Sequence, residues 1–248
     1  MTQITRRNAL QALGALTLGS LTTQATANVV APKHWNVTCD VLVIGGGDAG
    51  LFAAVSAREA GADVVLLDKA SVLLSNSSSL SAGSANATGT QAQLNAGIKD
   101  VGNEKEFASE IMKTGKGIAD PVLVDLFAKN SKNAINWLTE HGVIFTPQEN
   151  SAFRLRRMHG CDKHTGGEYI EVLSKNAKEI GVKIEMNTQA MELITNTAAD
   201  EVLGVVAQKE GKKISYRAKK AVILATGGFC GDVQMIDRYI LDFKGALT

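Results

Sequence analysis

Asp40-Val-Leu-Val-Ile-Gly-Gly-Gly-Asp-Ala-Gly-Leu51 is the stretch of sequence that decides the fold of this chain. The apolar run at residues 41–44 predicts a buried strand, and Gly45-x-Gly47-x-x-Gly50 follows it directly, ahead of a run with helical spacing. In this order the first Gly permits a tight turn, the second lets the backbone approach a diphosphate, and the third lets the helix pack against its strand. The helix N-terminus then faces the negative charge. The stretch predicts a dinucleotide-binding turn, and the alternative is an ordinary glycine-rich turn of an α/β domain.

A second apolar run follows this helix and supports the dinucleotide interpretation. It covers residues 63–67 and ends on Asp68, 18 residues after Gly50. An acidic side chain at this distance accepts hydrogen bonds from an adenosine ribose. Strand, glycine turn, helix, strand and acidic residue therefore predict a β-α-β unit that opens a Rossmann-like α/β domain with a parallel sheet.

The composition is that of an ordinary globular protein, with 248 residues, 45% of them hydrophobic and 21% charged. A formal net charge of +1 gives no sign of a nucleic-acid partner. Cys39, Cys161 and Cys230 lie too far apart for a metal knuckle and imply no disulfide framework. His159 and His164 have no acidic or thiol ligands at a helpful spacing, so no metal site is expected.

The first 27 residues have the features of an export signal. Residues 5–11 form a twin-arginine opening, residues 9–21 are mildly apolar, and Ala25-Thr26-Ala27 is a small-x-small cleavage site. The apolar run is shorter than the roughly 20 residues that span a bilayer, so no stable membrane anchor is expected. The alternative is the amphipathic N-terminal helix of a cytoplasmic protein, which leaves the cleavage site unexplained. We predict a twin-arginine signal peptide at 1–27, cleavage near Ala27, a linker at 28–38 and a periplasmic location.

Residues 71–93 are rich in Ser, Ala, Asn and Gly. This composition suits either a flexible linker or a loop wrapped closely around a ligand. A loop that leaves the second strand of a β-α-β unit lies at the carboxyl edge of the sheet, where ligands bind. The position therefore favours the ligand-wrapping interpretation.

Two helices are predicted between residues 104 and 142, and a basic loop follows them. Asp120 is a plausible N-cap of the second helix and Pro121 lies in its first turn. The apolar residues of this helix are interpreted as core: Val124, Leu126, Phe127, Ala134, Ile135, Trp137 and Leu138. The loop is either solvated or faces a cofactor or anionic substrate, because guanidinium groups bind carboxylates bidentately. Its basic residues are Arg154, Arg156, Arg157, His159, Lys163 and His164.

A helix at 168–180 and several β-type runs complete the pattern. Four short runs predict one strand of the main sheet and a small antiparallel meander: 182–186, 190–194, 202–208 and 213–216. Residues 221–225 then predict a buried parallel strand that ends in Thr226-Gly227-Gly228-Phe229. A second junction between a strand and glycines suggests a second backbone contact with the same long ligand. Residues 232–239 predict the start of a further helix.

From about Asp40 to its last residue the chain resembles the FAD-binding flavoproteins of the fumarate reductase and succinate dehydrogenase family, especially the soluble exported members. The order and spacing of the matching segments carry this resemblance. They are residues 40–50, 66–69 (Leu-Leu-Asp-Lys), 80–87 (Leu-Ser-Ala-Gly-Ser-Ala-Asn-Ala), Asp120-Pro121 with Trp137, 164–167 (His-Thr-Gly-Gly), Asn187-Thr188 and 223–229 (Ile-Leu-Ala-Thr-Gly-Gly-Phe). The chain departs from the family in having Asp68 where Glu is usual. It also has Ser75-Asn76-Ser77 where Gly-Gly-Asn is usual, which leaves the match there ambiguous by one position.

The resemblance implies FAD in an extended pose. The glycine turn would hold the pyrophosphate, Asp68 the adenosine ribose and the backbone at Ala190 the adenine. The Ser-rich loop would approach the pyrophosphate and the isoalloxazine, and Thr226 with Gly227 would close over the dinucleotide. The implied cofactor-binding residues are Gly45, Gly47, Asp48, Ala49, Gly50, Asp68, Lys69, Asn76, Ser77, Gly83, Ala190, Thr226 and Gly227.

The resemblance also implies hydride transfer from reduced flavin to the double bond of a small unsaturated carboxylate. No Cys-x-x-Cys-His run for covalent haem is present, so a redox partner protein is expected as electron donor. The catalytic groups are expected from a capping domain and a returning half of the FAD domain, so no catalytic residue is assigned. The expected fold is thus an FAD-binding domain at 39–248 that is incomplete at its C-terminus. The alternative is a non-catalytic or split flavin-binding subunit that needs a second chain, and an NAD-dependent dehydrogenase is disfavoured by the meander and the second glycine junction.

Overall fold

The computed structural model describes residues 31–150, 153–196, 198, 200–240, 242 and 245, without the side chains of 149, 150 and 153–156. The predicted signal peptide at 1–27 lies outside these residues. The first strand, β1 (Val37–Ile44), begins within the stretch expected to be a linker, 28–38. No helix in the described part of the chain is long and apolar enough to cross a membrane.

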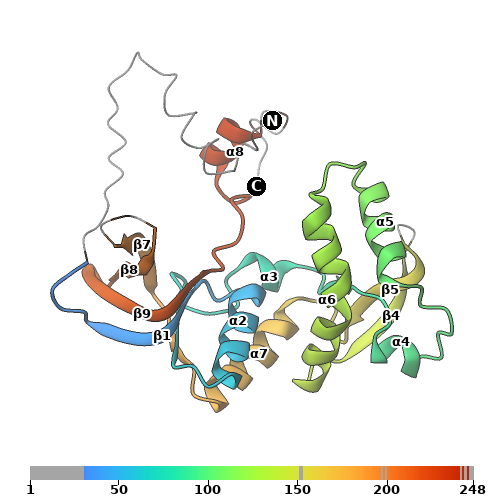
Figure 1. Ribbon diagram of the computed structural model, residues 1–248, viewed down its shortest axis with the longest axis horizontal. Helices are drawn as coiled ribbons and strands as arrows, with labels where there is room; N and C mark the ends of the chain where they lie inside the picture. The colour runs from blue at the N-terminus through green and yellow to red at the C-terminus, as the bar shows by residue number, and fades with distance from the viewer. Residues whose placement is uncertain are drawn as a thin grey trace.

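A six-stranded sheet forms one end of the molecule (Figure 1), with the strand order β6-β2-β1-β9-β8-β7. Its other members are β2 (Val64–Leu67), β6 (Lys183–Glu185), β7 (Thr188–Thr195), β8 (Val202–Lys209) and β9 (Lys212–Leu224). Strands β6, β2, β1 and β9 run parallel to one another, whereas β8 runs antiparallel to both β7 and β9. The predicted parallel sheet with an antiparallel meander is confirmed.

Helices α2 (Asp48–Glu59) and α7 (Gly167–Glu179) cover one face of this sheet. Leu51 and Val55 of α2 and Leu173 of α7 are buried against it. A second core cluster fills the opposite face, where Leu42 and Tyr216 are fully buried. Burial of apolar area on both faces fixes the position of β1, and therefore of the turn that follows it.

Strand β9 is continuous where the sequence predicts two strands at 213–216 and 221–225. Its first part pairs with β8 and its later part with β1, so the polar residues between the two parts stay extended. Lys219 and Lys220 there are exposed and form ion pairs with Asp40. The predicted burial of residues 221–225 is wrong, because Leu224 is 60% exposed. Among the described residues, β9 is paired only on its β1 side from residue 218 onward.

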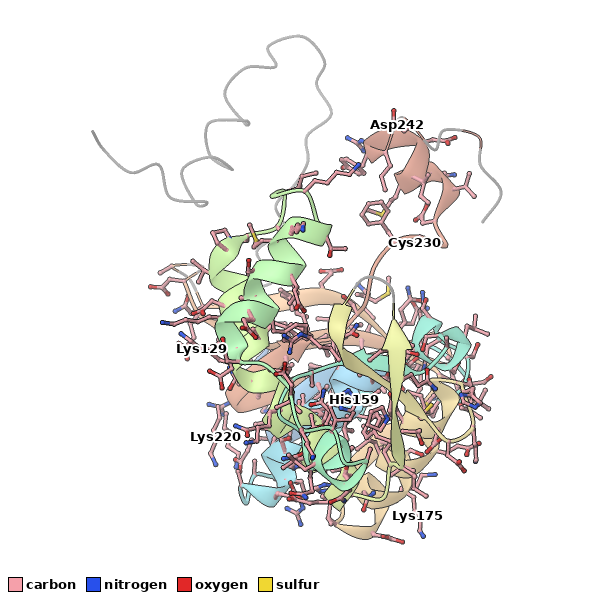
Figure 2. The ribbon with its side chains drawn as sticks, turned by 90° about the vertical axis from the view of Figure 1, so that its right-hand side faces the viewer. Lys129, His159, Lys175, Lys220, Cys230 and Asp242 are labelled. Atoms are coloured by element: carbon pink, nitrogen blue, oxygen red, sulfur yellow. The ribbon has the colours of Figure 1, made fainter. Side chains whose placement is uncertain are left out.

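A second, three-stranded antiparallel sheet occupies the place of the predicted basic loop. It has the order β3-β5-β4, with β3 (Ser84–Asn86), β4 (Phe145–Asn150) and β5 (Phe153–Cys161). The loop prediction is wrong for residues 153–161, which form β5, because Arg157 and His159 find partners inside the protein. Arg157 and His159 are fully buried, and Figure 2 shows His159 in the interior.

Helices α5 (Glu104–Thr114) and α6 (Pro121–Glu140) pack together at the end of the molecule away from the main sheet (Figure 1). Asp120 caps α6 by accepting hydrogen bonds from the N–H groups of Val122 and Leu123, as its predicted N-cap role requires. The remaining helices are short: α3 (Ser77–Leu80), α4 (Gln91–Asn95) and α8 (Val233–Tyr239).

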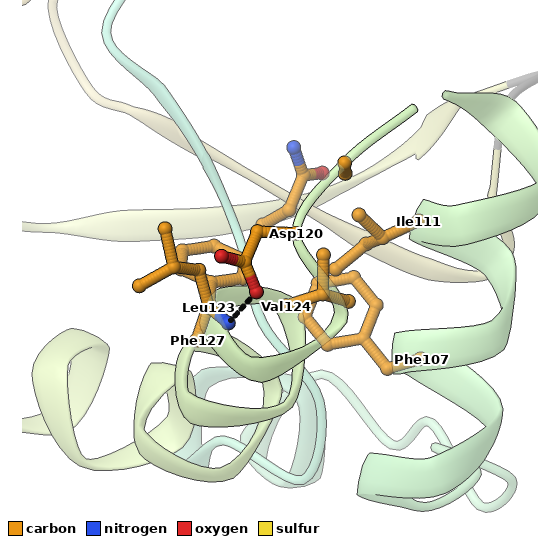
Figure 3. Close-up of a pocket in the computed structure, with 8 residues that line it drawn as sticks. Phe107, Ile111, Asp120, Leu123, Val124 and Phe127 are labelled. Carbon is orange, nitrogen blue, oxygen red and sulfur yellow. Dashed lines mark hydrogen bonds between the residues drawn. The ribbon is translucent and has the colours of Figure 1, made fainter. Parts of the chain in front are cut away.

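The prediction that the apolar residues of α6 are core holds for one face of the helix only. Val124 and Ile135 are buried, but Leu126 is 58% and Phe127 50% exposed. Phe127 and Phe107 line an apolar hollow of about 360 Å³ between α5 and α6 (Figure 3). Helical spacing identified an apolar helix, but the described chain supplies packing partners for only part of its circumference.

Candidate functional site

The glycine turn between β1 and α2 is shaped by two close backbone approaches. Gly45 has a φ of +106°, and a Cβ there would lie 2.3 Å from the carbonyl oxygen of Ala225. A Cβ on Gly50 would lie 1.8 Å from the carbonyl oxygen of Gly45. Neither position has room for a side chain, so both glycines are required by the fold itself.

Gly47 is different, because the fold alone does not demand a glycine there. Its φ is −74°, and the nearest neighbour of an added Cβ is the hydroxyl oxygen of Ser78 at 3.1 Å. Gly47 is also the N-cap of α2 and provides no side-chain hydrogen bond to the helix. The N–H groups in the first turn of a helix have no partners within the helix, and Ala49 in this turn is exposed. This helix end is therefore suited to bind an anion.

Asp68 and the second glycine junction lie beside this turn. The Asp68 carboxylate accepts hydrogen bonds from the N–H of Gly46 at 2.6 Å and of Ala70 at 2.8 Å. Each carboxylate oxygen has a further lone pair, which leaves capacity for a ribose hydroxyl. The N–H of Ala225 donates to the carbonyl oxygen of Ile44 at 2.8 Å, so the turn after β9 lies next to Gly45.

The other residues predicted to bind the adenosine lie at the same edge of the sheet. The N–H of Thr188, where β7 begins, donates to the carbonyl oxygen of Asp68 at 2.8 Å. Ala190 lies two residues further along β7, and Lys69 is exposed beside Asp68. The structure thus brings together segments that are far apart in the sequence, while the contacts of each residue with a cofactor remain a prediction.

In the Ser-rich loop, Ser78 is the residue that reaches the glycine turn. Its hydroxyl oxygen accepts a hydrogen bond from the N–H of Asp48 at 3.1 Å. Asn76 caps α3 by accepting from the N–H of Ser79 at 2.9 Å, and Ser77 is exposed. Sequence reasoning did not select Ser78, although the one-position ambiguity of the family match in this run of serines was a sign of it.

Gly83 fastens the loop that follows α3 to the second sheet. Its φ is +64°, and an added Cβ would lie 2.4 Å from the sulfur of Cys161. Its carbonyl oxygen accepts a hydrogen bond from the buried hydroxyl of Tyr169 at 2.6 Å. Gly83 therefore has a structural reason to be glycine, whatever else it contacts.

Arg157 and His159 of β5 belong to a closed polar cluster instead of a ligand site. Arg157 donates to Glu110 at 2.5 Å and to the carbonyl oxygen of Val101 at 3.0 Å. His159 lies 2.7 Å from the hydroxyl of Thr90, and burial lowers the pKa of its imidazole. These groups are neither solvated nor directed at a cofactor, which resolves the alternatives left open for Arg157 and His159.

Asp48 is the titratable group of the glycine turn. It is the first residue of α2, and one of its carboxyl oxygens, Oδ1, is buried without a hydrogen-bond partner. Burial raises the pKa of Asp48 to about 6, against the opposing effect of a hydrogen bond with Ser78. A carboxyl group with this pKa changes its charge under mild conditions.

This pKa predicts how Asp48→Asn changes stability with pH. The carboxyl pKa is raised from its ordinary value of 3.8 to about 6 on folding, so the folded state is penalised as the pH rises from about 4 to about 6. Asn removes this penalty. A shift of this size corresponds to ~3 kcal/mol, which solvent around the partly exposed carboxyl group reduces to ~1 kcal/mol. We therefore expect the Tm of Asp48→Asn to exceed that of the wild type by about 3 °C at pH 7.5 and to equal it near pH 4. Thermal melts at both pH values test this, and an equal difference at both would contradict it.

The parallel sheet, the uncapped glycine turn and the acidic residue after β2 define a Rossmann-like dinucleotide-binding protein. Residues 40–246 match the family model described as FAD binding domain. The chain belongs to this family, and the cofactor of the family is FAD.

Several relatives of the chain are reductases that are much longer than it is. A probable fumarate reductase of Shewanella frigidimarina is 36% identical, over 82% of this chain and 34% of that protein. A urocanate reductase of Eggerthella lenta is 33% identical, over 84% of this chain and 35% of that protein. The open conformation of a flavocytochrome c3 fumarate reductase superposes with a TM-score of 0.78 at 34% identity, over 85% of this chain and 37% of that one. The chain thus spans about a third of the length of these proteins.

The backbone of the glycine turn fits the diphosphate of this cofactor, but the charge of one residue in the turn, Asp48, does not. A side chain at Gly47 would project from the helix end that a diphosphate needs, and none is there. Asp68 retains acceptor capacity for a ribose. Asp48, however, places a carboxyl group at the helix end where the diphosphate is expected.

Proposed function

We propose that this chain is the FAD-binding part of an exported flavoenzyme that reduces the double bond of a small unsaturated carboxylate. The observation that carries the proposal is the uncapped turn from Gly45 to Gly50, held between the carboxyl ends of β1 and β9. The names of the relatives, a fumarate reductase and a urocanate reductase, support the reaction class.

The chain contributes the binding and orientation of the cofactor. The first turn of α2 binds the diphosphate through backbone N–H groups, and Asp68 accepts hydrogen bonds from the ribose hydroxyls. Thr226 and Gly227 approach the dinucleotide from the neighbouring strand end. When bound and reduced, FAD supplies a hydride to the substrate. No described residue is assigned to substrate binding or proton donation.

The proposal includes export and an external electron donor. Arg6 and Arg7, followed by an apolar run and a small-residue cleavage site, support export by the twin-arginine route to the periplasm, with the FAD-binding domain at 39–248. The sequence has no covalent haem motif, which supports a separate redox protein as the donor.

A flavin-binding chain without turnover of its own is the second candidate. The observation that favours it is that no described residue is assigned to substrate binding or proton donation. The two candidates share the cofactor and differ in activity.

Binding and turnover are separated by measuring them on the same preparation. We expect the purified chain to quench the fluorescence of added FAD and to retain a yellow chromophore after gel filtration. Oxidation of a reduced viologen dye that depends on fumarate or urocanate then supports the enzyme. A yellow chain without dye oxidation, active only with a second polypeptide, supports the second candidate. A colourless chain that binds NAD overturns both.

A further inference from the structure

We propose that Asp48 couples FAD binding to the uptake of one proton, so that the chain holds FAD more tightly as the pH falls. This inference rests on the proposed role of the glycine turn in binding FAD. Among residues 45–50 of the turn, only Asp48 has a titratable side chain, so only Asp48 can take up this proton.

The surroundings of Asp48 leave its charge unbalanced. Ser78 of α3 accepts a hydrogen bond from the Asp48 N–H at 3.1 Å, while carboxyl oxygen Oδ1 is buried without a partner. From α7, the hydroxyl of Tyr169 donates to the carbonyl oxygen of Gly83 and is thus already engaged. Asp68, on the other side of the turn, is itself an acid and is bound to backbone N–H groups. In the described part of the chain, no Lys, Arg or His forms an ion pair with Asp48.

Binding of FAD at this helix end would act against an ionised Asp48 in two ways. The diphosphate brings two negative charges to the N-terminus of α2, where Asp48 is the first residue. The cofactor also covers the turn and removes water from a carboxyl group that is already largely buried. Both effects favour the protonated form, which carries no charge and offers an O–H donor where the ionised form has only acceptors.

The direction of the pH dependence follows from this linkage. In the free protein the pKa of Asp48 is about 6 because of burial. Bound FAD raises this pKa further, so one proton is taken up on binding in the interval between the two pKa values. Within that interval the Kd for FAD rises about tenfold per pH unit, and below it the Kd is constant. We expect the Kd to be at least about tenfold weaker at pH 8 than at pH 5.5.

The experiment is a titration of the purified full chain with FAD, followed by fluorescence quenching, from pH 5.5 to 8 at constant ionic strength. The wild type is compared with Asp48→Asn and with Asp125→Asn, whose carboxylate is 54% exposed on α6 and pairs with Lys129. We expect the Kd of Asp48→Asn to be independent of pH and at least about tenfold tighter than that of the wild type at pH 8. Asp125→Asn should follow the wild type. Circular dichroism of each variant verifies that it is folded.

Calorimetry counts the proton directly. Titration of FAD at pH 7 in two buffers of different ionisation enthalpy should show net uptake by the wild type and about one proton less by Asp48→Asn. A wild-type Kd that does not change with pH, or an equal pH dependence in Asp48→Asn, would overturn the role of Asp48 and leave the FAD site intact. Folded wild type and Asp48→Asn that both fail to bind FAD at every pH would overturn the proposed function as well.

Discussion

Gly47→Val is expected to fold like the wild type and to lose FAD, with the Kd weakened at least about 100-fold, or ~2.8 kcal/mol. The backbone of Gly47 has a φ of −74°, which any residue adopts, and an added Cβ meets only Ser78, whose hydroxyl oxygen at 3.1 Å must shift slightly and whose Cβ lies at 4.0 Å. A branched side chain there would project from the N-terminus of α2 and keep a diphosphate away from the backbone N–H groups. Fluorescence titration with FAD, alongside circular dichroism and a thermal melt, measures both parts of the expectation.

Two other glycines give controls that bracket this result. Gly50→Val is expected to prevent folding, because its Cβ would lie 1.8 Å from the carbonyl oxygen of Gly45. Gly231→Ala is expected to change neither folding nor FAD binding, because an added Cβ meets nothing within 4 Å. If Gly47→Val folds and binds FAD within about threefold of the wild type, the diphosphate does not lie on this turn, and the proposed function loses its principal support.

Glu110→Gln is expected to destabilise the protein by about 3–5 kcal/mol. Its carboxylate accepts a hydrogen bond from Arg157 at 2.5 Å, and the Arg157 side chain is fully buried above the ring of Phe107. Removing the negative partner leaves a buried guanidinium without its counter-charge, which is far costlier than losing an exposed ion pair. The midpoint of urea unfolding, converted with the m-value, measures the loss.

The matched comparison is Asp125→Asn, which breaks an exposed ion pair of α6 and is expected to cost at most about 0.5 kcal/mol. The double variant Glu110→Leu with Arg157→Met removes both charges and should recover most of the stability lost in Glu110→Gln. A change below about 1 kcal/mol in Glu110→Gln would show that the other acceptors of Arg157, the hydroxyl of Thr88 and the carbonyl oxygen of Val101, are sufficient for the buried charge.

The local backbone chemistry of this protein can be predicted from its sequence. The apolar run before Gly45, the glycine spacing and the acidic Asp68 belong to one contiguous segment, so the strand, the turn and the next strand were predicted in the correct order. The start of α6 was predicted for the same reason, because Asp120 accepts hydrogen bonds from the helix it precedes. Interactions between residues that are a few positions apart can be predicted from the sequence, because both partners lie in the same short segment.

Burial and long-range partners decided the features that the sequence did not show. The charge of Arg157 favoured a loop interpretation of its segment, because nothing nearby in the sequence could neutralise it. Its partner Glu110 lies 47 positions away in the sequence. Strand β9 is continuous because it pairs with β8 along its first part and with β1 along its later part. The two lysines between these parts, Lys219 and Lys220, give no sign of this pairing in the sequence. Only the packing of α3 places Ser78 against the glycine turn.

The sequence by itself determined a β-α-β opening, a glycine turn of the dinucleotide-binding type and, through family resemblance, FAD as the cofactor. Only the tertiary structure decided which glycines have no room for a side chain, which serine reaches the turn and how far Asp48 is buried. The physical reason is that hydrogen-bonding capacity and backbone freedom belong to a residue type. The cost of a charge or of an added methyl group depends on the atoms that folding places around it.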